Sequence, residues 1–389
     1  MDLRENVEDR IRDYKAKLEI IDQAMAEEMK VVCSQRRMRI LQLYRYEKKA
    51  YRQTVLELES LLQGSIKPTE KFELTAFRRE PIIDKIHTAE NGTESKSVGS
   101  RTFRILQAGG LGDALLLTPT VRTLKQQYPG CKIYVYYRSK LFKEALLHNK
   151  YIDRLLHVNL LRRVTYHLLW RINRVNLLYP TYWELLPSLF YQKHAAEIIG
   201  EMAGVKIDDP RLDCFLTGDE EREAKKIVAK YPNPVAIHVT AKCSANKNWL
   251  TENWEKLVQN NPQYNFLQVG SPKDERIQGA VDLRMGLGLR KAFAAIKEVR
   301  AFVGVDSVFA HVAAAFETPA VVLFGASTPT VWGHVTSKNL YTSPNCSPCI
   351  DVIGPLSCPY GKMCMSDITV SDVELALSSI ITPPVRNPA

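Results

Sequence analysis

The sequence predicts an α/β protein made of two doubly wound domains, each a parallel sheet with helices on both faces. Two observations predict this class. From residue 102 onward, short apolar runs alternate with amphipathic segments of helical period, which is the pattern of repeated βαβ units. The alternation is interrupted near Pro210, which predicts a first domain of residues 102–212 and a second of residues 213–389.

The first βαβ unit begins with the apolar run at residues 103–107 and continues through a glycine-rich turn that contains Gly110 and Gly112. Such a turn lets backbone N–H groups and a helix N-terminus approach an anionic ligand, because glycine has no Cβ. Asp113 lies at the mouth of the turn. It either caps the following helix or faces the crevice beyond the strand as a general base.

Two further strands are predicted in the first domain, at residues 131–139 and 154–159. The segment that follows is basic and aromatic, and it contains Arg162 and Arg163. It is either a helix that covers the sheet, with an insertion, or a surface on which these arginines bind acidic acceptor groups.

The second domain repeats the strand and helix alternation, and each of its apolar strands ends in small or polar residues. The strands are predicted at residues 234–240, 265–271, 301–306 and 319–325. In open α/β sheets ligands bind beyond the carboxyl ends of the strands, so the loops after these strands are expected to line one crevice. The two domains are expected to face each other across a cleft.

Residues 1–64 form a predicted helical extension, because they lack proline in this range and place apolar residues at helical spacing. Two long helices fit best, either as a hairpin or as one strand of a coiled coil. The basic stretch at residues 33–52 fits a solvated helix face or contact with an anionic membrane surface. Residues 65–101 lose this patterning and are predicted to be a linker.

Charge and hydropathy limit the partners. The chain of 389 residues carries a formal net charge of +10, which favours acidic partners. It has no apolar run long enough to span a bilayer and no secretory signal pattern, so a cytoplasmic protein is expected. No nucleic-acid partner is expected, because no zinc-finger, RNA-recognition or basic-zipper pattern accompanies the charge.

Four motifs in order carry a family resemblance: FRILQAGGLGDALLLTP, HVTAKCSANKNWLTENWEKL, QVGSPKDE and FVGVDSVFAHVAAAFETPAVVLFGASTPTVWG. Together they resemble the bacterial ADP-heptose heptosyltransferases of glycosyltransferase family nine. The resemblance implies the GT-B architecture of two Rossmann-like domains facing a cleft. It also implies an inverting transfer of heptose from ADP-heptose to an acceptor hydroxyl, with the lipopolysaccharide inner core as the expected acceptor.

The resemblance implies a role for each matching residue. Asp113 matches the family's proposed general base, and the other matches are expected to bind the nucleotide sugar. Thr240 and Lys247 match the family's diphosphate contacts, Asp274 matches a ribose contact, and Leu287 matches an apolar residue near adenine. Asp306 and Ser307 match residues at the sugar and diphosphate, and His311, on the helix that follows, is also expected at the nucleotide-sugar site.

Alternatives remain for several of these residues. In the alternative interpretations, Lys247 is an exposed loop lysine and His311 is a hydrogen-bonded core histidine. Glu275 takes the ribose role in place of Asp274, or either of these carboxylates caps a helix. Relatives commonly have glycine where this chain has Val308, so another nucleotide-activated sugar is an alternative donor.

Cysteines cluster near the C-terminus in a C-x2-C-x8-C-x5-C pattern: Cys346, Cys349, Cys358 and Cys364. Four thiolates in a cytoplasmic protein suit a structural Zn or Fe ion, and packed thiols are the alternative. The resemblance implies that catalysis itself needs no metal cofactor.

Two other classes of function compete with the lipopolysaccharide enzyme. One is a heptosyltransferase that modifies protein. The other is a non-catalytic GT-B scaffold whose N-terminal helices drive assembly. An anionic glycolipid or glycan acceptor would place the enzyme peripherally at the inner membrane face, and the N-terminal helices could join copies into a homo-oligomer.

Overall fold

The computed structural model describes residues 101–107, 109–137, 139–158, 177–178, 193–344, 347–350, 358 and 360–381, with positions 8, 12, 15, 16 and 19. The chain divides into two compact units, Met1–Glu80 with Ser343–Leu356, and Pro81–Thr342 with Ser357–Ala389. The predicted N-terminal helices lie outside the described residues apart from the five isolated positions, which are helical. Within the described ranges, no helix is long and apolar enough to cross a bilayer.

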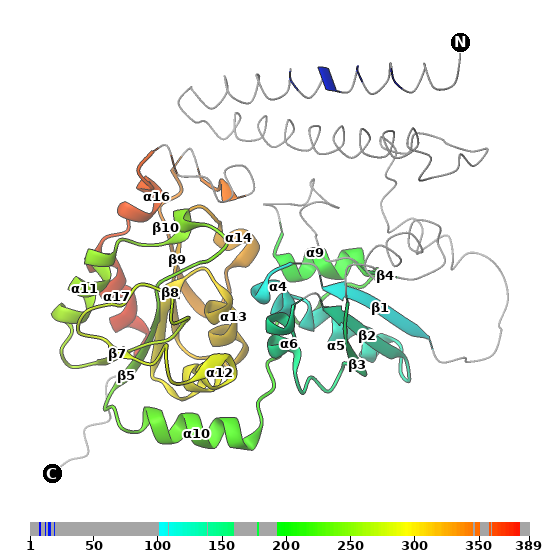
Figure 1. Cartoon of the computed structure of the whole chain (residues 1–389), viewed down its shortest axis with the longest axis horizontal. Helices are drawn as coiled ribbons and strands as arrows, with labels where there is room; N and C mark the ends of the chain where they lie inside the picture. Colours follow the sequence, from blue (N-terminus) through cyan, green and yellow to red (C-terminus); the bar gives the residue numbers. More distant parts are fainter. Residues whose placement is uncertain are drawn as a thin grey trace. The chain divides into compact units, whose positions relative to one another are not determined.

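The larger unit contains two parallel sheets (Figure 1). The first has four strands, in the order β3 (Arg154–His157), β2 (Lys132–Tyr137), β1 (Thr102–Gln107) and β4 (Leu177–Leu178). Its helices are α4 (Leu111–Leu116), α5 (Thr118–Gln127), α6 (Lys140–Leu146) and α9 (Ala195–Met202). The three predicted strands are confirmed within one or two residues, and β4 was not predicted.

The second sheet has six strands, in the order β10 (Ser337–Tyr341), β9 (Ala320–Phe324), β8 (Ala301–Val305), β5 (Pro234–His238), β6 (Asn265–Gln268) and β7 (Val281–Asp282). Its neighbouring strands pair in parallel: β10 with β9, β9 with β8, β8 with β5, β5 with β6, and β6 with β7. Its helical elements are α10 (Gly218–Val228), η1 (Ala245–Lys247), α11 (Thr251–Asn260), α12 (Gly288–Glu298), α13 (Val308–Ala315), α14 (Pro329–Trp332), α16 (Met363–Ser366) and α17 (Val370–Ile380).

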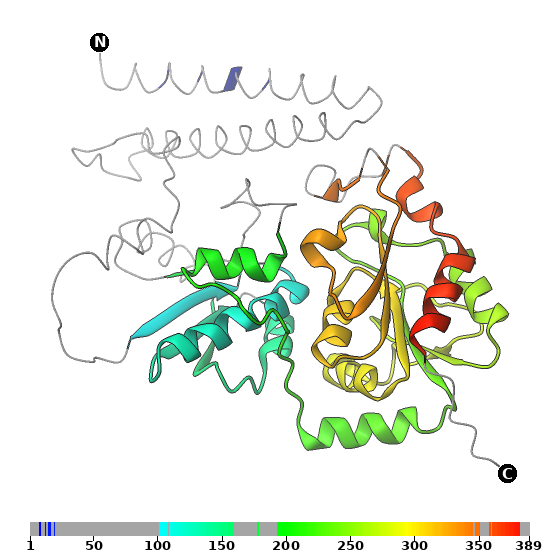
Figure 2. The same ribbon diagram turned by 180° about the vertical axis from the view of Figure 1, so that it is seen from behind.

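Strand residues of the second sheet alternate between two apolar clusters, as a pleated strand requires. In β8, Phe302 belongs to the cluster that contains α12 and α13, whereas Ala301 and Val303 belong to the cluster that contains α11 and α17. Figures 1 and 2 show these helix pairs on opposite sides of the sheet. The predicted doubly wound, parallel α/β arrangement is therefore confirmed for this sheet.

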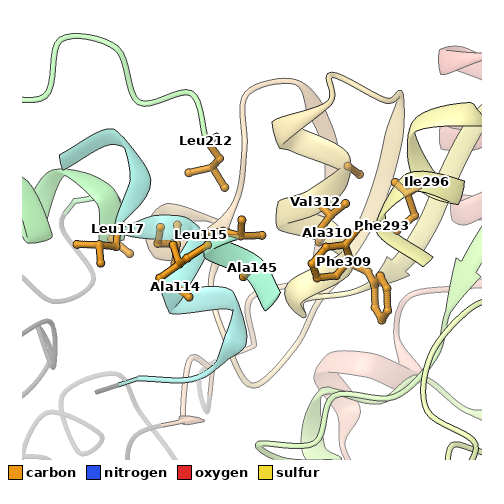
Figure 3. Packing of buried hydrophobic residues seen from close by; sticks show 14 of the residues in the cluster. Ala114, Leu115, Leu117, Ala145, Leu212, Phe293, Ile296, Phe309, Ala310 and Val312 are labelled. Atoms are coloured by element: carbon orange, nitrogen blue, oxygen red, sulfur yellow. The ribbon is translucent and has the colours of Figure 1, made fainter. Parts of the chain in front are cut away.

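One apolar cluster joins the two sheets. It contains Phe103 and Ile105 of β1 together with Phe302 of β8. Helices α4 and α13 contact each other within it, and the close-up shows Leu115 and Ala310 among its side chains (Figure 3). The predicted boundary at residues 212–213 remains a prediction.

Candidate functional site

The glycine turn after β1 is held by side chains at both of its ends. The buried Gln107 donates from Nε2 to the carbonyl oxygens of Gly109 (3.0 Å) and Gly110 (2.9 Å). The Gly110 N–H, at the N-cap position of α4, donates to Oδ2 of Asp113 at 2.5 Å, and because glycine has no side chain this bond is not reciprocated. The cap interpretation of Asp113 is therefore confirmed, and its role as a base remains a prediction.

Gly112 is required by a close approach, not by its backbone angles, since neither it nor Gly110 has a positive φ. A Cβ on Gly112 would lie 2.8 Å from Cδ2 and 3.1 Å from Nε2 of His311. The absence of a side chain therefore lets α4 pack directly on α13. This contact brings the turn that carries Asp113 to the helix that carries His311.

Replacing Gly112 by alanine is expected to destabilise the protein, because the new methyl group overlaps the His311 ring. Overpacking of this kind costs about 1–3 kcal/mol. Urea unfolding measures the loss. Gly286→Ala is the matched control, because a Cβ there meets nothing within 4 Å, and equal stability of the two variants would contradict the close approach.

Lys247 and Asp306 form a buried ion pair. The Nζ atom of Lys247 lies 2.6 Å from Oδ2 of Asp306, and the two residues are only 7% and 2% exposed. Burial opposes the charged lysine, but Asp306, then Cys243 and Asp113, outweigh it, so the pKa of Lys247 is raised. The interpretation of Lys247 as an exposed loop lysine is therefore wrong.

The loop that carries Lys247 is fixed by its neighbours. Asn248 accepts the Ala241 N–H at 2.7 Å, and Ser244 accepts the Asn246 N–H at 3.3 Å. Thr240 lies half-buried just before this loop, two residues beyond the end of β5.

Trp249, which follows the loop, is a packing residue. It is buried and donates from Nε1 to the Ile368 carbonyl at 2.8 Å. Its ring meets Trp254 edge to face. These contacts anchor the end of the loop to the apolar core of the second sheet.

Asp274 is buried and turned into its own loop. Its Oδ2 accepts the Ser271 N–H at 2.7 Å and lies 3.8 Å from Nε2 of His238. On the other side of that ring, Nδ1 of His238 lies 2.9 Å from Oγ of Ser307. Asp274 therefore orders its loop, Glu275 accepts a hydrogen bond from Thr251 instead, and a ribose contact remains a prediction.

Three histidines form a cluster, and one of them, His311, contacts Gly112. Nδ1 of His311 lies 2.8 Å from Nε2 of His334, and the His194 ring lies 5.4 Å from that of His334. Burial, first of all, lowers the pKa of His311 to about 3, that of His194 to about 4 and that of His334 well below its usual value. All three rings are therefore neutral near pH 7, and His311 is hydrogen-bonded within the core.

These neutral rings make stability sensitive to acid. In the unfolded chain they take up protons below about pH 6.5, whereas the folded protein excludes those protons. The free energy of unfolding is therefore expected to fall as pH drops below about 6.5, by up to about 1.4 kcal/mol per pH unit for each ring. His334→Asn should lower that slope by one ring's share, measured by urea unfolding from pH 7 to 5, whereas exposed His157→Asn should not. Identical slopes in both variants would contradict the neutral cluster.

The remaining predicted residues lie apart from this group or outside the described residues. Leu287 is buried at the start of α12 and lines a cavity of about 400 Å³ with Glu144 and Arg290. Arg162 and Arg163 lie outside the described residues.

The cysteines do not form a metal centre within the part of the chain that is described, where no group of three or more His, Cys, Asp or Glu side chains could hold an ion. Cys364 is buried in the apolar cluster of α11 and α17, and Cys358 accepts the Tyr360 N–H through sulfur at 3.4 Å. Cys349 is buried in the smaller unit. Cys346 lies outside the described residues, so the four-cysteine site remains a prediction.

Sequence reasoning did not identify Gln107, His194, His238 or His334. Gln107 and His238 are polar residues at the ends of apolar strands, and this sequence pattern could have marked them as site residues. His194 and His334 come from separate segments that meet only in the folded chain, so no local pattern marks them.

Comparison with known proteins gives a family for part of the chain. Residues 193–354 match the model of glycosyltransferase family 9 (heptosyltransferase). This segment contains Lys247, Asp274, Asp306 and His311 but not the turn of Asp113. The comparison with curated proteins finds no matching sequence.

Solved structures share the fold at low identity. The family 9 glycosyltransferase of Veillonella parvula DSM 2008 has a TM-score of 0.55 at 16% identity, covering 72% of this chain and 97% of its own. The iron-containing dodecameric glycosyltransferase TibC of enterotoxigenic E. coli H10407 has a TM-score of 0.55 at 17% identity, and the match covers 74% of this chain and 78% of TibC. ADP-heptose lps heptosyltransferase II of E. coli has a TM-score of 0.54 at 17% identity, and the match covers 72% of this chain and 98% of that enzyme. The family resemblance predicted from the motifs is confirmed for residues 193–354, which match the glycosyltransferase family 9 (heptosyltransferase) model.

Proposed function

We propose that the protein is an inverting glycosyltransferase that transfers heptose from ADP-heptose to a hydroxyl of the lipopolysaccharide inner core. The family match supports glycosyl transfer, and E. coli heptosyltransferase II, which shares the fold, is an ADP-heptose enzyme of lipopolysaccharide. The observation that carries the proposal is the buried ion pair of Lys247 and Asp306. The charge of Asp113 also helps to raise the pKa of this lysine.

These residues suit the two ends of the reaction. Asp113 would take the proton of the acceptor hydroxyl as its oxygen forms a bond to the anomeric carbon of the sugar. The bond from that carbon to the diphosphate breaks at the same time, and ADP leaves with the electron pair from the opposite face. Lys247 and the N–H groups at the start of α13 would stabilise the charge that grows on the diphosphate.

The donor is tested by calorimetry of the full chain with ADP-heptose, in parallel with UDP-, GDP- and other ADP-sugars. Selective binding of ADP-heptose is expected. Binding of a different nucleotide sugar would move the proposal to another donor. Binding of none by the folded protein would overturn it in favour of a non-catalytic scaffold.

The acceptor is tested by ADP release with heptose-free lipopolysaccharide. Arg162 and Arg163 are proposed to bind the acidic groups of this acceptor. The protein itself is proposed to lie peripherally on the cytoplasmic face of the inner membrane. Release with a protein acceptor instead would favour the protein-modifying alternative.

We also propose a homo-oligomer formed through the predicted coiled coil of residues 1–64. The likeness in fold to TibC, which is dodecameric, supports it. Light scattering of the full chain should give more than one copy per particle. A monomer would overturn this part of the proposal.

A further inference from the structure

Ser307 occupies the N-cap position of α13 but does not cap the helix. Its extended backbone (φ −160°, ψ 178°) suits a cap, yet its side chain accepts no N–H from the first turn. Its Oγ lies instead 2.9 Å from Nδ1 of His238. The first N–H groups of α13 are thus left without a serine oxygen, although serine normally caps at this position.

His238 is held firmly at the end of β5. It is buried, and its ring lies 4.5 Å from that of Phe309 on α13. Burial lowers its pKa to about 3, so near neutral pH only one ring nitrogen carries a proton. Which nitrogen carries it decides whether Ser307 donates or accepts in their hydrogen bond.

Asp274 decides between the two tautomers. Its Oδ2 lies 3.8 Å from Nε2 of His238, on the ring edge away from Ser307. A carboxylate beside Nε2 attracts the N–H dipole and repels a bare lone pair, so the proton is placed on Nε2. Nδ1 then has only a lone pair, and the Ser307 hydroxyl must be the donor of the bond.

A serine hydroxyl whose O–H donates to His238 presents only lone pairs to a ligand. The oxygens of an ionised diphosphate carry no proton and cannot donate to it, whereas a sugar hydroxyl can. We propose that Ser307 accepts a hydrogen bond from a hydroxyl of the transferred sugar, and that His238 is a positioning residue that fixes this polarity. The inference rests on the function proposed above.

The surroundings of Ser307 favour the transferred sugar over the ribose. Ser307 directly follows Asp306 of the buried ion pair. It lies one helical turn from His311, whose ring faces the turn that carries Asp113. The diphosphate is left to Lys247 and the uncapped N–H groups of α13. Ser307 would then contribute to the choice of sugar and not to the affinity for ADP.

Calorimetry of Ser307→Ala with ADP and with ADP-heptose separates these roles. Loss of one hydrogen bond is expected to weaken ADP-heptose about 3- to 10-fold. Binding of ADP, which lacks the transferred sugar, should change less than about 2-fold. The control Ser378→Ala, on the exposed face of α17, should alter neither. Equal weakening of both ligands, or no change in either, would overturn the inference. If the wild-type protein binds no ADP-heptose, it is the proposed function that fails.

The tautomer is tested without a variant. Long-range ¹⁵N–¹H correlation spectra of the histidine-labelled full chain should show His238 protonated at Nε2, with its resonance assigned through loss in His238→Asn. A proton on Nδ1 would make Ser307 the acceptor and overturn the inference. His238→Asn keeps an acceptor for the Ser307 hydroxyl, so it is expected to retain wild-type discrimination between ADP-heptose and ADP, whereas His238→Leu, which leaves the hydroxyl without this acceptor, should reduce it.

Discussion

Replacing Asp113 by asparagine is expected to lower the rate of sugar transfer by about 10²- to 10⁴-fold, the usual contribution of a positioned general base. Asparagine keeps an oxygen that can accept the Gly110 N–H, so this cap of α4 should survive while the base is lost. The measurement is the release of ADP from ADP-heptose with heptose-free lipopolysaccharide.

The control for this experiment is Asp113→Ala, which removes both the base and the cap. Its transfer rate should match that of Asp113→Asn, but its free energy of unfolding should be lower by about 1 kcal/mol because the cap is lost. A near-normal rate in Asp113→Asn would mean that Asp113 serves only as a cap.

Breaking the Lys247–Asp306 pair is expected to have the largest effect on stability. Lys247→Ala leaves the carboxylate of Asp306 buried, at 2% exposure, without its cation. Removal of one partner from such a pair costs about 3–5 kcal/mol. Urea unfolding measures this loss, and calorimetry measures the expected loss of ADP-heptose binding.

Two further variants separate the fold from the site. Lys242→Ala changes an exposed lysine of the same loop and should leave both quantities unchanged. The double variant Lys247→Met with Asp306→Leu should recover stability, because apolar residues replace a buried ion pair at little cost, yet it should still not bind the donor. Donor binding by the double variant would show that the ion pair is structural only.

Much of the fold follows from local pattern. The strands from β1 to β9 that carry long apolar runs are confirmed, because each run alone indicates a buried strand. The strand β7 has two residues, and its pairing with β6 defines it, so it has no pattern of its own. β10 reads SKNLY and is half exposed at the edge of its sheet, where apolar periodicity is weak.

The site was predictable where a motif is continuous in sequence. The turn of Asp113, the loop of Lys247 and the start of α13 are each local, and the structure brings all three together. Their hydrogen-bond partners were harder to find. Ser307 is 69 residues from its partner His238 in sequence, and His238 in turn lies 3.8 Å from Asp274. Only the folded chain brings together these three side chains, on which the proposed polarity of Ser307 depends.

The direct packing of α4 on α13 limits how the two sheets can move. Gly112 and the apolar residues around Leu115 and Ala310 keep these helices in contact inside one cluster. Swinging the sheets apart would expose that apolar surface to water, whereas sliding one helix along the other would keep it covered. Any closure around a ligand is therefore expected to be a shear of small amplitude, in which Asp113 shifts along α13 and does not leave it.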